Sequence, residues 1–87
     1  MPIELGQVVR SMAGHDAGGF YMVVSMGDGW VGLADGRRRK LEAPKRKSVK
    51  HIRKTNTVLD PSGIGTNKKL RETLGAFCAS EGGKKLV

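Results

Sequence analysis

A chain of 87 residues accommodates one small domain with a thin core, because only 38% of its residues are hydrophobic and 5% are aromatic. Its 16 Lys and Arg residues outnumber 8 Asp and Glu residues, so the formal net charge is +8 at pH 7. These figures argue against a large catalytic cleft, a cofactor domain or a second core, and no apolar stretch is long enough to span a bilayer.

The first half of the chain has the pattern of short strands separated by tight turns. The turns are rich in Gly and Asp, which tolerate the backbone conformations of sharp reversals. The segment 20–26 is apolar on nearly both faces, which is typical of the central strand of a curled sheet. We therefore predict a mainly β fold, a small antiparallel barrel of four to five strands over residues 6–12, 20–26, 30–34, 37–41 and 48–52.

The character of the sequence changes after residue 54. The segment that follows contains two glycines and a proline and lacks a strand pattern, whereas the segment beyond it has helical spacing of apolar residues. The predicted organisation is a barrel over residues 1–54, a linker over residues 55–66, a short C-terminal α-helix over residues 67–81 and a tail over residues 82–87.

The predicted helix is amphipathic. Thr66 or Asn67 can cap its first turn, and Leu70, Leu74 and Phe77 form one narrow apolar stripe. A helix of this length is marginal alone, so we expect the stripe to dock on the barrel, with a groove for a partner protein as the alternative.

The positive charge is concentrated in one segment. Residues 37–54 hold ten cations and one acid, a net charge of +9, whereas the rest of the chain has a net charge of −1. Phosphate contacts by Lys and Arg release condensed counterions, and the Arg guanidinium can bind phosphate through two donors. We therefore predict that this segment binds nucleic acid, rather than being a solvated charge run or contacting an anionic membrane surface. Lys68, Lys69 and Arg71 of the helix could add phosphate contacts. The predicted binding residues are Arg37, Arg38, Arg39, Lys40, Lys45, Arg46, Lys47, Lys50, Arg53 and Lys54.

Three segments, taken in order, resemble a known family. Residues 6–19 resemble the KOW motif of RNA-binding and ribosomal proteins, and the likeness continues to residue 24. In this segment a predicted strand leads into a turn with glycines at positions 14, 18 and 19. Residues 14–18 and 30–36 are similar to the turn and the following strand of the large-subunit ribosomal protein of the eukaryotic and archaeal fourteen-e type. Residues 45–52 resemble the basic run of that protein. The chain thus resembles a small bacterial relative of it, over about residues 5–54.

This resemblance implies an SH3-like barrel that binds ribosomal RNA, most directly RNA of the large subunit, with neighbouring ribosomal proteins as further partners. It also implies that the turn carrying Gly14, His15 and Gly18 faces the RNA beside residues 37–54, which we call the basic strip. The backbone of the turn requires these glycines whether or not RNA is bound. His15 can contact phosphate or stand idle, and Asp16 is better explained as an acceptor that caps the turn.

Other side chains have both a packing and a binding interpretation. Trp30 and Tyr21 can stack on unpaired bases, but a domain with four aromatic residues needs them as packing volume. His51 is expected to pack at a strand end. Cys78 adjoins the apolar stripe of the helix, which favours a buried, inert thiol.

Nothing in the sequence has the pattern of an enzyme. The chain lacks a phosphate-binding Walker loop, a zinc-binding helix motif and a nucleophile elbow, and its one cysteine and two histidines have no metal-ligand spacing. We therefore expect no catalytic residues, no metal, no cofactor and no small-molecule substrate. The single cysteine and the absence of a secretory signal pattern indicate a cytoplasmic protein without a membrane partner.

The predicted function is non-catalytic RNA binding by a ribosomal or ribosome-associated protein. Two other classes stay open at this stage: a protein-interaction module of the transcription or translation machinery, and a DNA-binding nucleoid protein. A pure peptide-binding module would bind with shallow salt dependence and would not need the basic strip.

Overall fold

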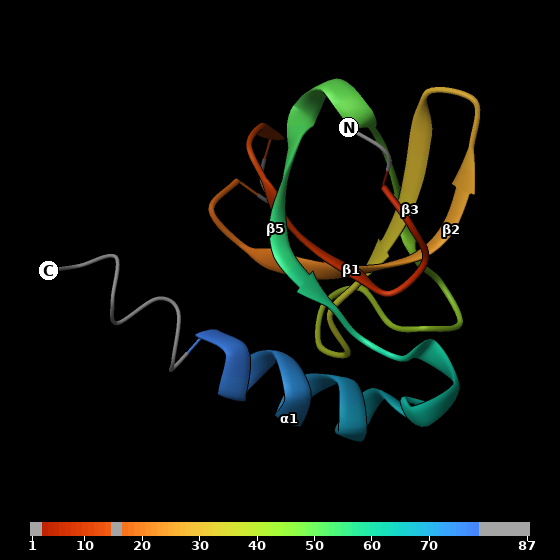
Figure 1. Ribbon diagram of the computed structural model, residues 1–87, viewed down its shortest axis with the longest axis vertical. Helices are drawn as coiled ribbons and strands as arrows, with labels where there is room; N and C mark the ends of the chain where they lie inside the picture. The colour runs from red at the N-terminus through yellow and green to blue at the C-terminus, as the bar shows by residue number, and fades with distance from the viewer. Residues whose placement is uncertain (1–2, 15–16, 79–87) are drawn as a thin grey trace, which may run out of the picture.

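A five-stranded sheet and one α-helix make up the part of the chain that the computed structural model describes, residues 3–14 and 17–78 (Figure 1). Two turns of 3-10 helix, η2 (Val49–His51) and η3 (Pro61–Gly63), connect these elements. In chain order the main elements are β1 (Gln7–Ser11), β2 (Phe20–Gly27), β3 (Trp30–Ala34), β4 (Lys45–Ser48), β5 (Ile52–Val58) and α1 (Asn67–Phe77).

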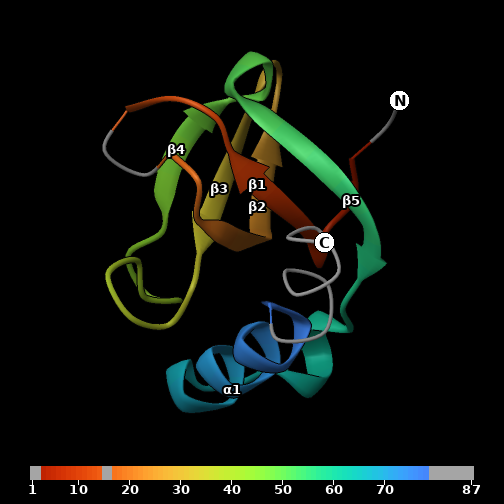
Figure 2. The same ribbon diagram turned by 90° about the vertical axis from the view of Figure 1, so that its left-hand side faces the viewer.

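The sheet is antiparallel throughout, with the strand order β4-β3-β2-β1-β5. The mainly β fold and the central position of β2 are therefore confirmed. β4 and β5 follow one another in the chain but lie at opposite ends of this order, so the sheet curls strongly on itself (Figures 1 and 2). No ladder joins these two fully described strands, and complete closure into a barrel stays a prediction.

The strand predicted over residues 37–41 is wrong, because the chain forms a compact loop there. The side chain of Asp35 accepts hydrogen bonds from the backbone amides of Arg37 (2.9 Å) and Arg39 (3.0 Å), and the amide of Asp35 donates to the carbonyl of Arg39 (2.8 Å). The turn residues Asp35 and Gly36 thus close a loop on themselves instead of starting a hairpin.

The strand predicted over residues 48–52 is also wrong, because a 3-10 turn divides it. The strand before the turn is β4, whose residue Lys45 pairs with Leu33 and whose residue Ser48 pairs with Trp30. The hydroxyl of Ser48 caps η2 by accepting a hydrogen bond from the amide of Lys50 (3.2 Å). β5 then begins at Ile52 and continues to Val58, into the segment expected to be irregular.

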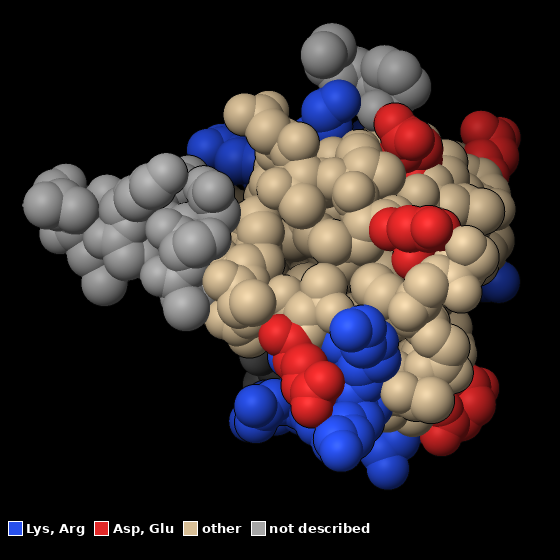
Figure 3. Space-filling model, turned by 60° about the horizontal axis from the view of Figure 1, so that its bottom comes forward, with Lys and Arg blue, Asp and Glu red and all other residues tan. Residues whose placement is uncertain are grey.

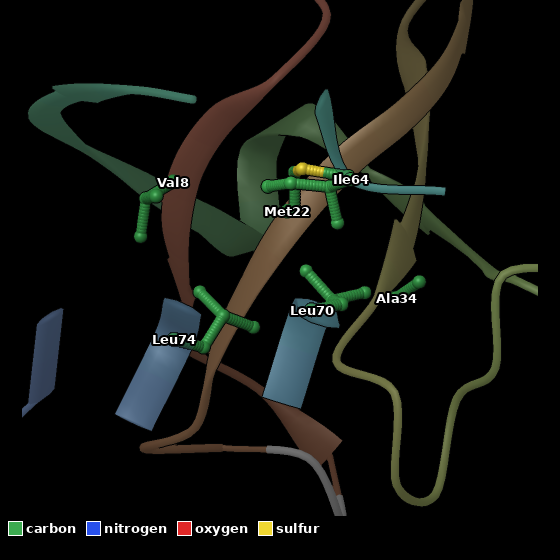
Figure 4. Close-up of a cluster of buried hydrophobic side chains, with 6 residues drawn as sticks. All are labelled: Val8, Met22, Ala34, Ile64, Leu70 and Leu74. Carbon is green, nitrogen blue, oxygen red and sulfur yellow. The ribbon is translucent and has the colours of Figure 1, made fainter. Parts of the chain in front are cut away.

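Each face of the sheet carries its own apolar cluster. Val9, Tyr21, Val23, Val31 and Leu33 form the cluster within the curl. The other face contributes Val8, Met22 and Ala34, which pack against Ile64 and against Leu70 and Leu74 of α1 (Figure 4). Alternate residues of β2 enter alternate clusters, as the apolar pattern on both faces of that segment predicts.

The predicted helix and its docking on the sheet are confirmed. The hydroxyl of Thr66 accepts a hydrogen bond from the amide of Lys69 (3.1 Å), so Thr66 is the N-cap. The stripe Leu70, Leu74 and Phe77 faces the sheet, where the Phe77 ring meets Phe20 edge-on at 5.2 Å between centroids. α1 ends at Phe77; the predicted end at residue 81 and the tail lie outside the described residues.

Docking of α1 is expected to contribute a large share of the stability. Leu70 is completely buried, so Leu70→Ala should lower the free energy of unfolding by about 2–5 kcal/mol through lost transfer energy and a cavity. The matched control Lys69→Ala changes an exposed neighbour and should stay within about 0.5 kcal/mol of the wild type. Urea denaturation checks both values, and equal stabilities for the two variants would contradict the docking.

Candidate nucleic-acid interface

The structure divides the predicted basic strip among three places. Arg37 to Lys40 lie in the loop before β4, the next group lies in β4 and η2, and Arg53 and Lys54 lie in β5. β4 and β5 are at opposite ends of the strand order. The cations that are contiguous in sequence are therefore not one continuous row on the sheet, and each group has its own surroundings.

The loop at residues 35–44 packs against the beginning of α1. Gly36 has a φ of +80°, and a Cβ at this position would collide with the carbonyl oxygen of Asn67, so only glycine allows the approach. The guanidinium Nη1 of Arg71 donates a hydrogen bond to the carbonyl of Gly36 (3.0 Å). The loop cations therefore lie beside Arg71, although Gly36 and Arg71 are 35 residues apart in the chain.

The side chain of Asn67 fixes the other end of this loop. Its Oδ1 accepts a hydrogen bond from the amide of Leu41 (2.8 Å), and its Nδ2 donates to Oε1 of Glu42 (2.9 Å). The hydrogen bond from Asn67, followed by a backbone hydrogen bond and the charge of Lys40, lowers the pKa of Glu42. The carboxylate thus stays ionised and keeps its contact with the helix terminus at neutral pH.

We call the cations that this packing brings together the loop–helix cluster. Figure 3 faces the side of the molecule that carries α1, and it shows a group of Lys and Arg side chains at the lower edge with acidic side chains beside it, while other Lys and Arg side chains lie apart from this group. Arg37, Arg38 and Lys40 are exposed, whereas Arg39 is half-buried. The cluster consists of Arg37, Arg38, Arg39, Lys40 and Arg71.

Lys47 has a structural role that the sequence did not indicate. It pairs with Val31 across the ladder, so its side chain enters the interior of the curled sheet, and the residue is 9% exposed. Its Nζ donates hydrogen bonds to the hydroxyl of Ser11 (3.0 Å) and the carbonyl of Ala13 (2.7 Å). This amine ties β4 to the end of β1, and its burial removes Lys47 from the candidate phosphate contacts.

The remaining cations of β4 and η2 lie along the edge of the sheet. Lys45 is half-buried and Lys50 is exposed, while the guanidinium of Arg46 lies 4.1 Å from the ring centroid of Trp30. Charged side chains on an edge strand also prevent pairing with other chains, so this group is a weaker indication of RNA binding than the loop–helix cluster. Arg46 and Lys50 are thus the exposed cations of β4 and η2.

The aromatic residues predicted as possible stacking platforms are engaged in packing. Tyr21 is 5% exposed and lies in the cluster within the curl. The indole of Trp30 lies against Gly27, where a Cβ would collide with it, and Arg46 covers the ring. His51 is exposed on η2, so its predicted packing at a strand end is wrong. Packing therefore accounts for both Tyr21 and Trp30.

The turn between β1 and β2 has the backbone geometry that its glycines predict. Gly14 and Gly18 have φ angles of +77° and +89°, in the left-handed region that favours glycine. The amide of Gly18 donates to the carbonyl of Ser11 (2.8 Å), and the amide of Ala17 donates to the carbonyl of Gly14 (3.1 Å). His15 and Asp16 lie outside the described residues, so the predicted phosphate contact of His15 has no structural description.

A groove between β5, β1 and α1 contains residues that the sequence reasoning missed. Its volume is about 340 Å³, and no Asp or Glu is among the described residues that line it. Arg10 was not among the predicted site residues, because it is isolated in sequence from the basic strip and only the antiparallel register places it opposite Arg53. We call this hollow the β5 groove; it is lined by Arg10, Phe20, Arg53, Lys54, Thr55, Asn56, Thr57 and Phe77.

A buried amide holds the backbone of two residues that line the β5 groove. The Nε2 of Gln7 donates hydrogen bonds to the carbonyls of Thr55 (2.8 Å) and Thr57 (3.3 Å), where the register between β1 and β5 shifts. The hydroxyl of Thr55 donates to the carbonyl of Val8 (2.8 Å). These bonds satisfy backbone groups that the irregular register leaves without ladder partners, so the groove is built into the sheet.

Comparisons with known proteins add no family. No protein-family model matches the sequence, and no curated protein matches it either.

Among the described residues, no group of three or more His, Cys, Asp or Glu side chains could hold a metal ion, and no described helix is long and apolar enough to cross a membrane. Burial raises the pKa of the Cys78 thiol, which keeps it protonated at neutral pH.

The anchoring role of Lys47 can be measured directly. Lys47→Met keeps most of the apolar volume but leaves the Ser11 hydroxyl and the Ala13 carbonyl without their donor, so the free energy of unfolding should fall by about 1–2 kcal/mol. Lys50→Met, at an exposed position of η2, is the control and should change it by less than about 0.5 kcal/mol. Equal free energies of unfolding for the two variants would contradict the anchoring role.

Proposed function

We propose that this protein is a non-catalytic RNA-binding protein of the cytoplasm, and that the loop–helix cluster is its principal contact with RNA. The observation that carries the proposal is the exposure of Arg37, Arg38 and Lys40 without an ion pair to any described residue. Like charges at this density repel one another, and a polyanion relieves that repulsion and releases its own counterions on binding.

The loop that presents these cations is fixed before binding. The Asp35 side chain and the contacts of Gly36 and Asn67 with α1 hold its backbone at both ends. Less conformational entropy is therefore lost when RNA binds than with a flexible basic tail. Cations on a fixed scaffold suit contacts with a regular phosphate backbone, and duplex RNA is recognised largely by its shape and backbone rather than by base edges.

The resemblance of residues 5–54 to the KOW motif and to a large-subunit ribosomal protein directs the proposal to ribosomal RNA. The predicted partners are RNA of the large subunit and neighbouring ribosomal proteins. The two glycines of the β1–β2 turn, with their positive φ angles, are compatible with the close approach of an RNA backbone that the motif implies. A protein-interaction module gains no comparable support, because the exposed cations would have no role in it.

The proposed contact predicts a change in the salt dependence of RNA binding. Arg37→Ala/Arg38→Ala removes two exposed cations and leaves the backbone bond from residue 37 to Asp35 in place. With a hairpin RNA from the large subunit, the negative slope of log K against log salt should become less negative by roughly 1.4–1.8, at 0.7–0.9 for each lost phosphate contact. Fluorescence anisotropy over a salt series measures this slope.

A matched control separates contact from net charge. Lys47→Met also removes one positive charge of the basic strip, but from a buried side chain, so it should leave the slope of the wild type unchanged. Both variants are measured well below their unfolding temperatures. An unchanged slope for the double Arg variant would remove the loop–helix cluster from the interface, and equal affinity for duplex DNA and the RNA hairpin would favour the nucleoid alternative.

A further inference from the structure

The β5 groove has the chemistry of an anion site that is also partly apolar. The cations Arg10, Arg53 and Lys54 line it together with the rings of Phe20 and Phe77, and no described lining residue is acidic. Hydroxyl and amide groups of residues 55–57 complete the lining. This combination of cations, hydrogen-bonding groups and aromatic rings matches the parts of a nucleotide: phosphate, sugar and base.

Arg10 and Arg53 are direct cross-strand partners on β1 and β5. Both are exposed, and neither forms an ion pair with any described residue. Like charges directly opposite each other on neighbouring strands destabilise a sheet. A phosphate between the two guanidinium groups would turn this repulsion into two attractive contacts, because each guanidinium can donate two hydrogen bonds to phosphate oxygens.

The aromatic side chains lie beside this pair of arginines. The guanidinium carbon of Arg10 is 5.9 Å from the ring centroid of Phe20, and the rings of Phe20 and Phe77 meet at an angle of 67°. Both rings are half-buried, so each keeps part of its surface toward solvent. Unpaired bases stack on such rings and on guanidinium planes, whereas the bases of a duplex are already stacked and paired.

A second hollow connects the groove with the loop–helix cluster. Its volume is about 270 Å³, and it is lined by Phe20, Asp35, Arg37, Arg71, Leu74, Gly75 and Cys78. Phe20 lines both hollows, so they adjoin there. A nucleic-acid strand that runs from Arg37 and Arg71 over Phe20 to Arg10 and Arg53 would begin and end at cations, and it would pass the carboxylate of Asp35 on the way.

We propose that the β5 groove binds a single-stranded segment of the RNA whose duplex part rests on the loop–helix cluster. One phosphodiester lies between Arg10 and Arg53, and its base lies against Phe20 and Phe77. The groove is too small for two paired strands, which selects an unpaired nucleotide. The proposal rests on the proposed function and gives it a specificity: the preferred target is a junction between duplex and single-stranded RNA.

The test compares three RNA probes that share one hairpin stem. One probe is blunt, the second carries a short unpaired tail at its 5′ end, and the third carries the same tail at its 3′ end. The wild-type protein should bind one of the tailed hairpins about tenfold more tightly than the blunt hairpin, near the lower end of what one stacked base contributes. A tail of abasic nucleotides should lose most of this gain, because it keeps the phosphates and removes the bases.

Variants assign the gain to the groove. Arg10→Gln/Arg53→Gln should reduce the tenfold preference to less than about twofold. The preference is the ratio of the affinities of one variant for the tailed and the blunt hairpin, so a general loss of charge affects both affinities and cancels in the ratio. The double variant removes one like-charge pair, and its thermal unfolding midpoint in low salt should be no lower than that of the wild type. Lys50→Gln, an exposed cation of η2, is the matched control and should keep the full preference.

The outcomes separate the two proposals. Equal wild-type affinity for tailed and blunt hairpins would overturn the groove proposal and leave the proposed function standing. Absence of binding to every probe would overturn both proposals. A tenfold preference that survives in the double Arg variant would overturn the groove proposal by placing the single strand elsewhere on the protein. A preference of the same size for the abasic tail would overturn the predicted contact between the base and the two Phe rings.

Discussion

The central strand β2 imposes one constraint on the whole domain, because both of its faces are apolar. Met22 faces the cluster that α1 covers, and Tyr21 and Val23 face the cluster within the curl. A chain of this size has too few apolar residues to cover both faces with further layers of sheet. The sheet therefore curls over one cluster, and the stripe of Leu70 and Leu74 closes the other.

Closing these two clusters also arranges the charged surface. Docking of α1 brings its first turn against the loop at Gly36, and this contact joins the loop cations to Arg71. The same helix ends beside the first residue of β2, where Phe77 meets Phe20 and forms a wall of the β5 groove. Within the curl, the amine of Lys47 links β4 to the end of β1. The candidate RNA-binding surface is thus a consequence of how a thin core is covered.

The sequence predicted the elements whose signals lie within a few neighbouring residues. The predictions failed where contacts between residues far apart in the chain determine the structure. The apolar patterns of β1 to β3 and the cap at Thr66 are visible within a few residues. β4 was missed because Lys47 occupies an inward position that the apolar pattern cannot reveal. The predicted hairpin at Gly36 failed because hydrogen bonds to Asp35 close the loop and α1, far along the chain, packs against it. Arg10 joins the site through the register with Arg53, which no single strand specifies.

The central claim is that the basic surface organised by α1 attaches the protein to ribosomal RNA in the cell. Sedimentation of cell extract through sucrose gradients at low and high salt tests it most directly, with the protein located by antibody in each fraction. The account predicts migration with the large ribosomal subunit at low salt and release toward the top at high salt, because phosphate contacts weaken steeply with salt. A position at the top of the gradient at both salt concentrations would contradict it.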